Sequence, residues 1–171
     1  MILVKSKALF EQHSEGAPWW SVLGSHMYKH ILIATDGSEA AGEAVAGGLA
    51  LAKALGARVT AVTVTDIYPT GPYSPIPFPA TIERYEAAAA EGAAQVLASV
   101  AEAAAKLGVS CRSVHVKDQT PAEGIIATIA AEGCDLVVMG SHGRRGLSRL
   151  LLGSQAQKVV TLSPVSVLVC R

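Results

Sequence analysis

Residues 135–143 read DLVVMGSHG. The stretch begins with a nearly continuous apolar run, residues 135–139, and continues with glycines at positions 140 and 143. A short run of this kind is typical of a parallel strand covered on both faces. Glycines directly after a strand allow tight turns and a close approach of the backbone to another group. This stretch therefore predicts a central strand, followed by a loop at the sheet edge where α/β proteins bind ligands.

Strand-like and helix-like segments alternate on both sides of this stretch. The predicted strands are 30–35, 58–65, 110–116, 135–139 and 165–170, and the predicted helices are 39–55, 82–107, 121–132 and about 153–162. This order predicts an α/β fold, an open and mostly parallel five-stranded sheet with helices on both faces. The segments that follow strands are therefore the candidates for a functional site.

Local signals set several boundaries of these segments. Ser38 is a good helix N-cap, and Gly56 is a typical residue just after a helix end. The run Thr120–Glu123 combines a cap, a proline at the first helical position and a capping box. Five prolines between residues 69 and 79 predict a loop that is neither helix nor central strand.

The first 26 residues lack sustained periodicity, and the strand pattern begins only after Met27. Residues 24–27 read GSHM, which resembles the scar of a cleavable expression tag. We therefore divide the chain into residues 1–26, a tag or N-terminal extension, and residues 27–171, the folded domain. The alternative is a native extension whose Trp19 and Trp20 dock on the domain or on a neighbour.

Composition excludes several classes of function. Fourteen Lys and Arg balance fourteen Asp and Glu, so the overall charge suggests neither nucleic acid nor a membrane surface as a partner. No apolar run reaches the length of a membrane helix. The three cysteines are far apart and lack metal-ligand spacing, which favours a reducing, cytoplasmic setting.

The glycines after the central strand belong to a longer pattern. Gly140 and Gly143 are followed, after nine intervening residues, by Gly153 and Ser154, giving G-x2-G-x9-G-S. Backbone N–H groups, a helix N-terminus and a hydroxyl at one place suit a polyphosphate. Arg144 on the intervening loop is a candidate for a further phosphate contact. The alternative is that these glycines only shape tight turns. Neither a P-loop nor a GxGxxG motif is present.

Four stretches together resemble the universal stress protein family across residues 27–171: HILIATDGSEAA, VTAVTVTD, CDLVVMGSHGRRGLSRLLLGS and SPVSVLVC. The glycine pattern resembles the branch of that family that binds ATP. The resemblance implies a Rossmann-like fold of the adenine nucleotide alpha hydrolase type. It also implies a homodimer formed through the final strand.

The resemblance also implies which residues hold the nucleotide, ATP with Mg²⁺. The turn after the first strand would contact the nucleoside, the second strand would meet adenine through its backbone, and the glycine segment would surround the ribose and phosphates. The residues at the matching positions are Ala34, Thr35, Asp36, Val64, Met139, Gly140, His142, Gly143, Gly153, Ser154 and Gln155. Asp66 and Asp118 are interpreted as ordinary loop acids, with a role in holding Mg²⁺ as the alternative.

Three classes of function remain open at this point. The first is a nucleotide-binding regulatory module of the stress response, which we favour because no base with an orienting partner accompanies the phosphate pattern. The second is a slow Mg²⁺-dependent ATPase or a phosphotransferase. The third is an interaction protein without a ligand, against which the intact glycine pattern argues. His142 is given no catalytic role.

Overall fold

The computed structural model describes residues 2–4, 28–66, 78–143 and 152–171. In chain order its elements are β1 (Ile2–Val4), β2 (His30–Ala34), α2 (Glu39–Leu55), β3 (Arg58–Val64), α3 (Pro79–Leu107), β4 (Cys111–Val116), α4 (Pro121–Glu132), β5 (Leu136–Gly140), α5 (Ser154–Leu162) and β6 (Ser166–Cys170).

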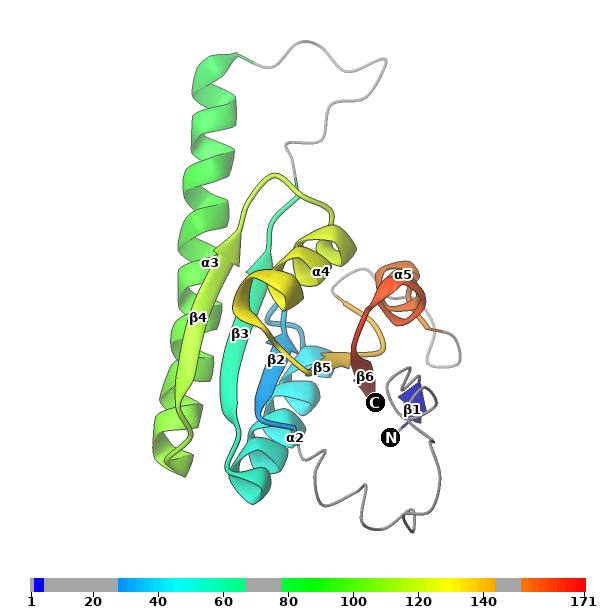
Figure 1. The fold of residues 1–171 in the computed structure, drawn as a ribbon. Helices are drawn as coiled ribbons and strands as arrows, with labels where there is room; N and C mark the ends of the chain where they lie inside the picture. Colours follow the sequence, from blue (N-terminus) through cyan, green and yellow to red (C-terminus); the bar gives the residue numbers. More distant parts are fainter. Residues whose placement is uncertain (1, 5–27, 67–77, 144–151) are drawn as a thin grey trace, which may run out of the picture.

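Five strands form the parallel sheet predicted from the alternating pattern, in the order β6-β5-β2-β3-β4 (Figure 1). The chain runs from β2 outward through β3 to β4, and then crosses back to β5 on the other side of β2. The order of strands therefore reverses between β2 and β5. In an open α/β sheet this reversal leaves a crevice at the carboxyl ends of the two strands.

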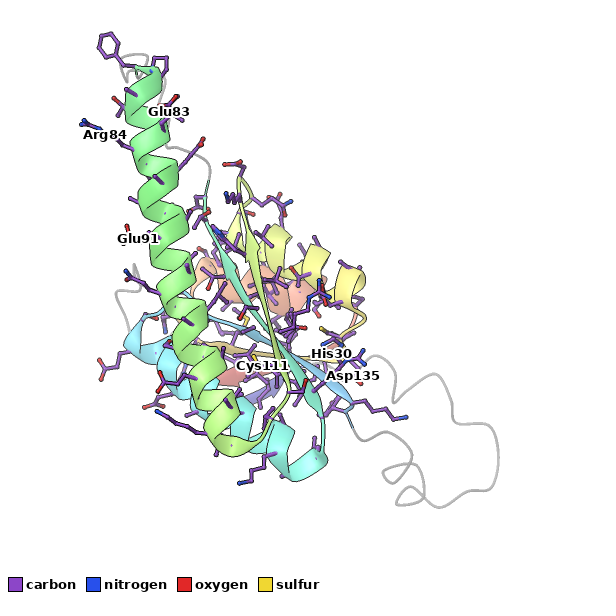
Figure 2. The ribbon with its side chains drawn as sticks, turned by 90° about the vertical axis from the view of Figure 1, so that its left-hand side faces the viewer. His30, Glu83, Arg84, Glu91, Cys111 and Asp135 are labelled. Atoms are coloured by element: carbon purple, nitrogen blue, oxygen red, sulfur yellow. The ribbon has the colours of Figure 1, made fainter. Side chains whose placement is uncertain are left out.

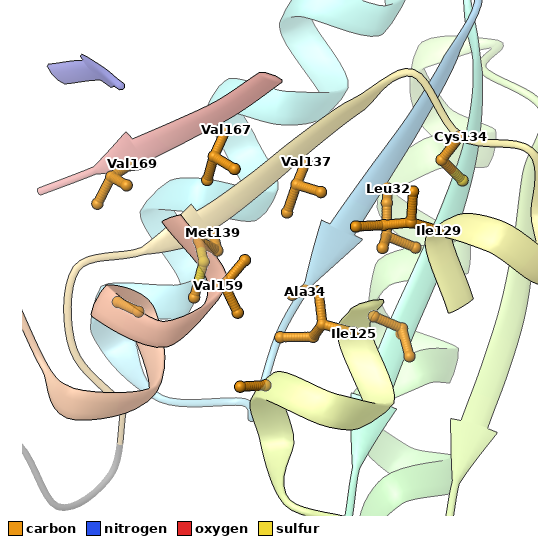
Figure 3. Close-up of a cluster of buried hydrophobic side chains, with 13 residues drawn as sticks. Leu32, Ala34, Ile125, Ile129, Cys134, Val137, Met139, Val159, Val167 and Val169 are labelled. Atoms are coloured by element: carbon orange, nitrogen blue, oxygen red, sulfur yellow. The ribbon is translucent and has the colours of Figure 1, made fainter. Parts of the chain in front are cut away.

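Helices cover both faces of the sheet, as expected, and each face has its own apolar core. On one face, α4 and α5 pack on alternate residues of β2, β5 and β6, including Leu32, Val137 and Val167 (Figure 3). On the other face, α2 and α3 pack on Ile31, Ile33 and Val138. Strands buried on both sides in this way account for the continuous apolar runs of the sequence.

The predicted helix boundaries are largely reproduced. Ser38 caps α2 by accepting from the Ala41 N–H, and Gly56 ends that helix in the left-handed conformation with φ 63°. Pro79 was expected in the proline-rich loop, and this expectation was wrong. It is the first residue of α3, where its missing N–H has no intrahelical partner to lose. The other prolines of that loop lie outside the described residues.

A sixth strand comes from the segment that the sequence analysis set apart from the domain. Ile2–Val4 pairs antiparallel with β6, in the register Ile2 with Val169 and Val4 with Val167. The outer edge of β6, expected to pair with a second copy, is therefore covered by the chain's own N-terminus. Among the described helices, none is both long and apolar enough to cross a membrane.

Candidate functional site

A cavity of about 660 Å³ opens at the carboxyl ends of the parallel strands. Its floor comes from the ends of β2, β3 and β5, so it covers the point where the strand order reverses. The first turns of α2, α4 and α5 contribute to its walls, and α3 closes one side. Cavities of this size accommodate cofactor-sized ligands.

The turn between β2 and α2 is held by its own side chains. Asp36 Oδ1 accepts from the Ser38 N–H at 3.0 Å, and Thr35 Oγ1 accepts from the Gly37 N–H at 3.2 Å. Gly37 has φ 76°, a conformation that glycine adopts without strain. The turn is tied to β3 as well, because the Thr63 hydroxyl donates to the Thr35 carbonyl at 2.9 Å. These bonds fix the half-exposed Asp36 carboxylate at the cavity.

The glycine that ends β5 and the glycine three residues later lie close to other groups. A Cβ at Gly140 would lie 3.0 Å from the Ala40 carbonyl oxygen, and a Cβ at Gly143 would lie 2.7 Å from Asp36 Oδ2. Gly143 therefore brings the second part of the predicted site against the first. Beside it, Ser141 Oγ and His142 Nδ1 lie 3.0 Å apart, within hydrogen-bond distance.

The three helices that begin at the cavity differ in how their N-termini are capped. In α2 the Ser38 side chain occupies the Ala41 N–H. In α4 the Ala122 N–H donates to Gln155 Oε1 at 3.1 Å, and a capping box joins Thr120 to Glu123.

In α5 the N-cap residue is Gly153, which has no side chain to serve as a cap. The Gly153 N–H donates to the Ser141 carbonyl at 2.9 Å, so it is not available to a ligand. Helix geometry leaves the N–H groups of Ser154, Gln155 and Ala156 without intrahelical acceptors. This first turn lines the cavity and adds the positive end of the helix dipole, so α5 provides the best anion site there.

The part of the cavity at the end of β3 has both apolar and polar lining residues and was only partly foreseen. Val64 lies there, as expected, at the end of β3. The wall facing it comes from α3, whose N-terminal half extends past the strands (Figure 1) and whose small residues leave space beside Tyr85. Figure 2 shows Glu83, Arg84 and Glu91 pointing outward from the same helix. The cavity residues that sequence reasoning missed include Thr63, Tyr85, Ala89, Gly92, Pro121 and Ile125.

One signal for this wall was present in the sequence. Tyr85 falls on the apolar face of its helix, and four successive alanines, residues 87–90, follow it. Sequence periodicity shows which face of a helix is buried, but not which strand end that face approaches. The wall therefore required the packing of α3 against the sheet.

The structure brings eleven of the twelve residues proposed for the site to one cavity, whereas Arg144 lies outside the described residues. The eleven are Ala34, Thr35, Asp36, Val64, Met139, Gly140, His142, Gly143, Gly153, Ser154 and Gln155. Of the two further acids considered for Mg²⁺, Asp66 lines the cavity and Asp118 does not. The described residues contain no cluster of three or more His, Cys, Asp or Glu that could hold a metal ion by itself.

The fold and the site together define an open α/β protein with a ligand cavity at its strand-order reversal. The sequence matches the universal stress protein family over residues 27–171. It is 37% identical over 145 residues to a universal stress protein of Thermus aquaticus, covering 85% of this chain and all of that one. It is 32% identical over 148 residues to one from Methanocaldococcus jannaschii, covering 86% and 85%. The chain belongs to the universal stress protein family.

Solved structures agree with this assignment. The universal stress protein UspA from Lactobacillus plantarum superposes with a TM-score of 0.72 at 25% identity, over 84% of this chain and 98% of that one. The same fold is found in a universal stress protein in complex with cAMP, with a TM-score of 0.63, 22% identity and coverage of 85% and 98%. It is also found in one from Archaeoglobus fulgidus in complex with dAMP, with a TM-score of 0.57, 17% identity and coverage of 85% and 99%.

Proposed function

We propose that this protein binds ATP in the cavity and acts as a nucleotide-dependent module of the stress response. The observation that carries this proposal is the first turn of α5, which has no side-chain cap and lies in the same cavity as the Asp36 carboxylate and Val64 at the end of β3. A polyphosphate needs the backbone donors of a helix N-terminus, a ribose needs a hydrogen-bond acceptor such as a carboxylate, and a purine needs a partly apolar surface. Two proteins of the same fold are described in complexes with adenine nucleotides.

The phosphates are assigned to the first turn of α5. The backbone N–H groups of Ser154, Gln155 and Ala156 and the Ser154 hydroxyl are the donors there. Gly140 and Gly143 allow the ligand to approach the backbone of the preceding loop. Arg144 remains a proposed additional phosphate contact.

The nucleoside is assigned to the opposite end of the cavity. A carboxylate accepts hydrogen bonds from ribose hydroxyls, and Asp36 is held in place for this role by the Ser38 N–H. Ala34 belongs to the turn assigned to the nucleoside, the backbone of Val64 is assigned to adenine, and Met139 is assigned with the glycine segment to the ribose and phosphates.

The described residues fit Mg²⁺ only when the phosphates of a bound nucleotide also coordinate the ion. Mg²⁺ is commonly bound through one or two carboxylates together with substrate phosphates. Asp36 and Asp66 are the acids that line the cavity. When bound, the ion would neutralise phosphate charge, while the chain's own residues would still supply the donors of α5.

A binding module suits the site better than an enzyme. Efficient phosphoryl transfer requires a positioned base or water-orienting group in addition to phosphate contacts. His142, the only imidazole lining the described cavity, lies within hydrogen-bond distance of Ser141 and is not paired with a carboxylate in the contacts observed there. Any ATP hydrolysis is therefore expected to be slow.

Binding is tested by titrating ATP into the wild type, Gly153→Ala, Gly153→Asp and Ala50→Asp. The Gly153→Asp side chain would place a negative charge beside the phosphates, so ATP affinity should fall by about tenfold or more. Gly153→Ala adds only a Cβ, 3.3 Å from the Ser141 carbonyl oxygen, and should cost less. Ala50→Asp adds the same charge on the exposed side of α2 and should bind like the wild type. Equal binding by all four proteins would refute the site.

Catalysis is tested separately by following ATP consumption with Mg²⁺. A module is expected to retain ATP over many minutes at an excess of ligand. Rapid and saturable turnover, abolished by Gly153→Asp, would instead establish the enzyme.

We also propose that the protein forms a homodimer through β6. An apolar parallel strand at a sheet edge presents backbone groups that a second strand can pair with. In this structure Ile2–Val4 occupies that edge, so the homodimer requires β1 to be displaced.

A further inference from the structure

The side chain of Gln155 joins two helices whose first turns line the cavity. Gln155 is the second residue of α5, and its Oε1 accepts from the Ala122 N–H of α4 at 3.1 Å. Because the partner is a donor, the amide must present its oxygen to it, which fixes the orientation of the amide group.

The bond completes the N-terminus of α4. The first residue of that helix is Pro121, which has no N–H, so Ala122 carries the first backbone donor. This donor is partly buried, and its acceptor comes from a residue 33 positions away in the chain. A cross-helix bond of this kind holds two elements at a set distance, which a local cap does not.

The position of α4 itself is set by close packing on the sheet. A Cβ at Gly124 would lie 2.8 Å from both γ carbons of Val64, so α4 sits directly on the end of β3. Gln155 thus connects the first turn of α5 to a helix that is already fixed. The N-cap of α5 is glycine, so it has no side chain to make such a tie, and its backbone N–H is bonded instead to the Ser141 carbonyl after β5.

We propose that Gln155 is a positioning residue for the phosphate end of the site. Its backbone N–H belongs to the anion-binding turn, while its side chain holds that turn against α4. The inference rests on the proposed nucleotide function, but it assigns to the Gln155 side chain a role that ligand contact does not require. Preorganised donors bind more tightly because no ordering of the turn is needed on binding.

If Gln155 positions the phosphate end of the site, its substitution should weaken the binding of ATP but not the binding of adenosine. Gln155→Met keeps the length and shape of the side chain and removes the acceptor. Its Kd for ATP is expected to rise by about fivefold, the effect of losing one hydrogen bond of ordinary strength. Its Kd for adenosine, which does not reach α5, should remain within about twofold of the wild-type value.

Two further variants make the comparison specific. Gln155→Asn retains the amide chemistry but is one CH2 group too short to reach Ala122, and it should behave like Gln155→Met. Gln157→Met makes the same substitution at an exposed position in the same helix, and it should bind both ligands like the wild type.

The outcomes separate this inference from the proposed function. If the wild type binds ATP and the Gln155 variants bind it equally well, the positioning role is wrong and the function stands. A parallel loss of ATP and adenosine affinity would show a general structural defect and would also overturn the role. If the wild type binds neither ligand, the proposed function itself fails.

Discussion

At the scale of single residues, the site depends on places where no side chain fits. Gly143 is the clearest case, because a Cβ there would lie 2.7 Å from Asp36 Oδ2. Real Cβ atoms do not come this close to a carboxylate oxygen, so either the loop or the carboxylate would have to move. The glycine therefore keeps Asp36 in its position at the cavity.

Gly143→Ala should consequently weaken nucleoside binding. We expect displacement of the Asp36 carboxylate to raise the adenosine Kd by about tenfold, the effect of a lost charge-assisted hydrogen bond. Isothermal titration with adenosine measures this directly. Gly42→Ala is the control, because a Cβ there has nothing within 4 Å. Unchanged adenosine binding in Gly143→Ala would contradict the role of Asp36.

A second residue-scale feature lies at the opposite edge of the sheet. His30 is buried at the start of β2, its Nε2 lies 2.8 Å from Thr60 Oγ1, and its Nδ1 is buried with no hydrogen-bond partner among the residues that the structure describes. Figure 2 shows His30 beside Asp135, which accepts from the His30 backbone N–H at 3.1 Å. Burial lowers the pKa of His30 below 6.5, and Arg58 lowers it further against the opposing effect of Asp135 and Glu132.

This lowered pKa predicts a loss of stability in mild acid. The unfolded chain takes up a proton near pH 6.5 while the folded His30 remains neutral, so stability present above pH 6.5 falls as the pH drops toward the folded pKa. Below the folded pKa this group causes no further loss. Urea unfolding at pH 7.5 and pH 5 should show a smaller pH dependence for His30→Gln than for the wild type. Burial also lowers the pKa of His115, which accounts for part of the pH dependence that remains in His30→Gln.

At the scale of elements, α2 approaches the sheet closely because of a glycine that sequence periodicity did not single out. A Cβ at Gly48 would lie 2.8 Å from Ile33 Cδ1 and 3.3 Å from Val138 Cγ1. These contacts place α2 over β2 and β5, the two strands between which the order reverses. The start of α2 is thereby held at the cavity.

Gly48→Ala should therefore destabilise the protein, although alanine is the better helix former. Overpacking of this kind costs about 1–3 kcal/mol. Gly42→Ala lies in the same helix with open space around it, and it should instead stabilise the protein by about 0.5–1 kcal/mol. Chemical denaturation of both variants measures the difference. Equal stabilisation by the two substitutions would show that α2 does not pack as closely as described.

The outer edge of β6 is the second feature at this scale. Ile2–Val4 pairs with Val167–Val169 there, and a strand edge can form only one ladder at a time. Replacing Val167 or Leu168 with a charged residue would not test the dimer contact alone. The Val167 side chain is buried in one core and the Leu168 side chain in the other, so a charge at either position would also destabilise the fold. The competition is better tested through the N-terminal strand.

Removing residues 1–26 should raise the dimer fraction if the β6 edge forms the dimer. Leu3→Pro in the full chain should act in the same direction, because proline is poorly accommodated within a paired strand and does not shorten the chain. Sedimentation equilibrium at several concentrations measures both. A monomer at all concentrations after truncation would count against β6 as the dimer edge.

At the scale of the whole molecule, one cavity collects residues from six separate stretches of the chain, one of which is in α3. The ends of β2, β3 and β5 and the starts of α4 and α5 meet there because parallel strands share one carboxyl edge. A ligand that contacts all of these parts binds the folded state and not the unfolded chain. Its binding energy therefore adds to global stability.

ATP should raise the melting temperature accordingly. At a free concentration of one hundred times Kd, the stabilisation is about 2.7 kcal/mol. For a domain of this size that corresponds to an increase of roughly 5–10 °C. Differential scanning calorimetry with and without ATP measures it, and Gly153→Asp, whose Kd is expected to be about tenfold higher or more, should show about half of that increase or less at the same ATP concentration. An ATP-independent melting temperature in the wild type would contradict binding.

The grouping of eleven proposed residues at one edge was implied by the family resemblance, whereas the sequence alone determined the parallel α/β sheet and most helix ends. These follow from local physics, since periodicity sets strands and helices, Gly56, Gly108 and Gly133 end helices, and β-α-β order makes the sheet parallel. Only the tertiary structure decided the α3 wall beside Tyr85, the Gln155 bond to Ala122 and the strand that covers β6. Each joins segments far apart in the chain, and no local pattern records which distant backbone group or surface a side chain will meet.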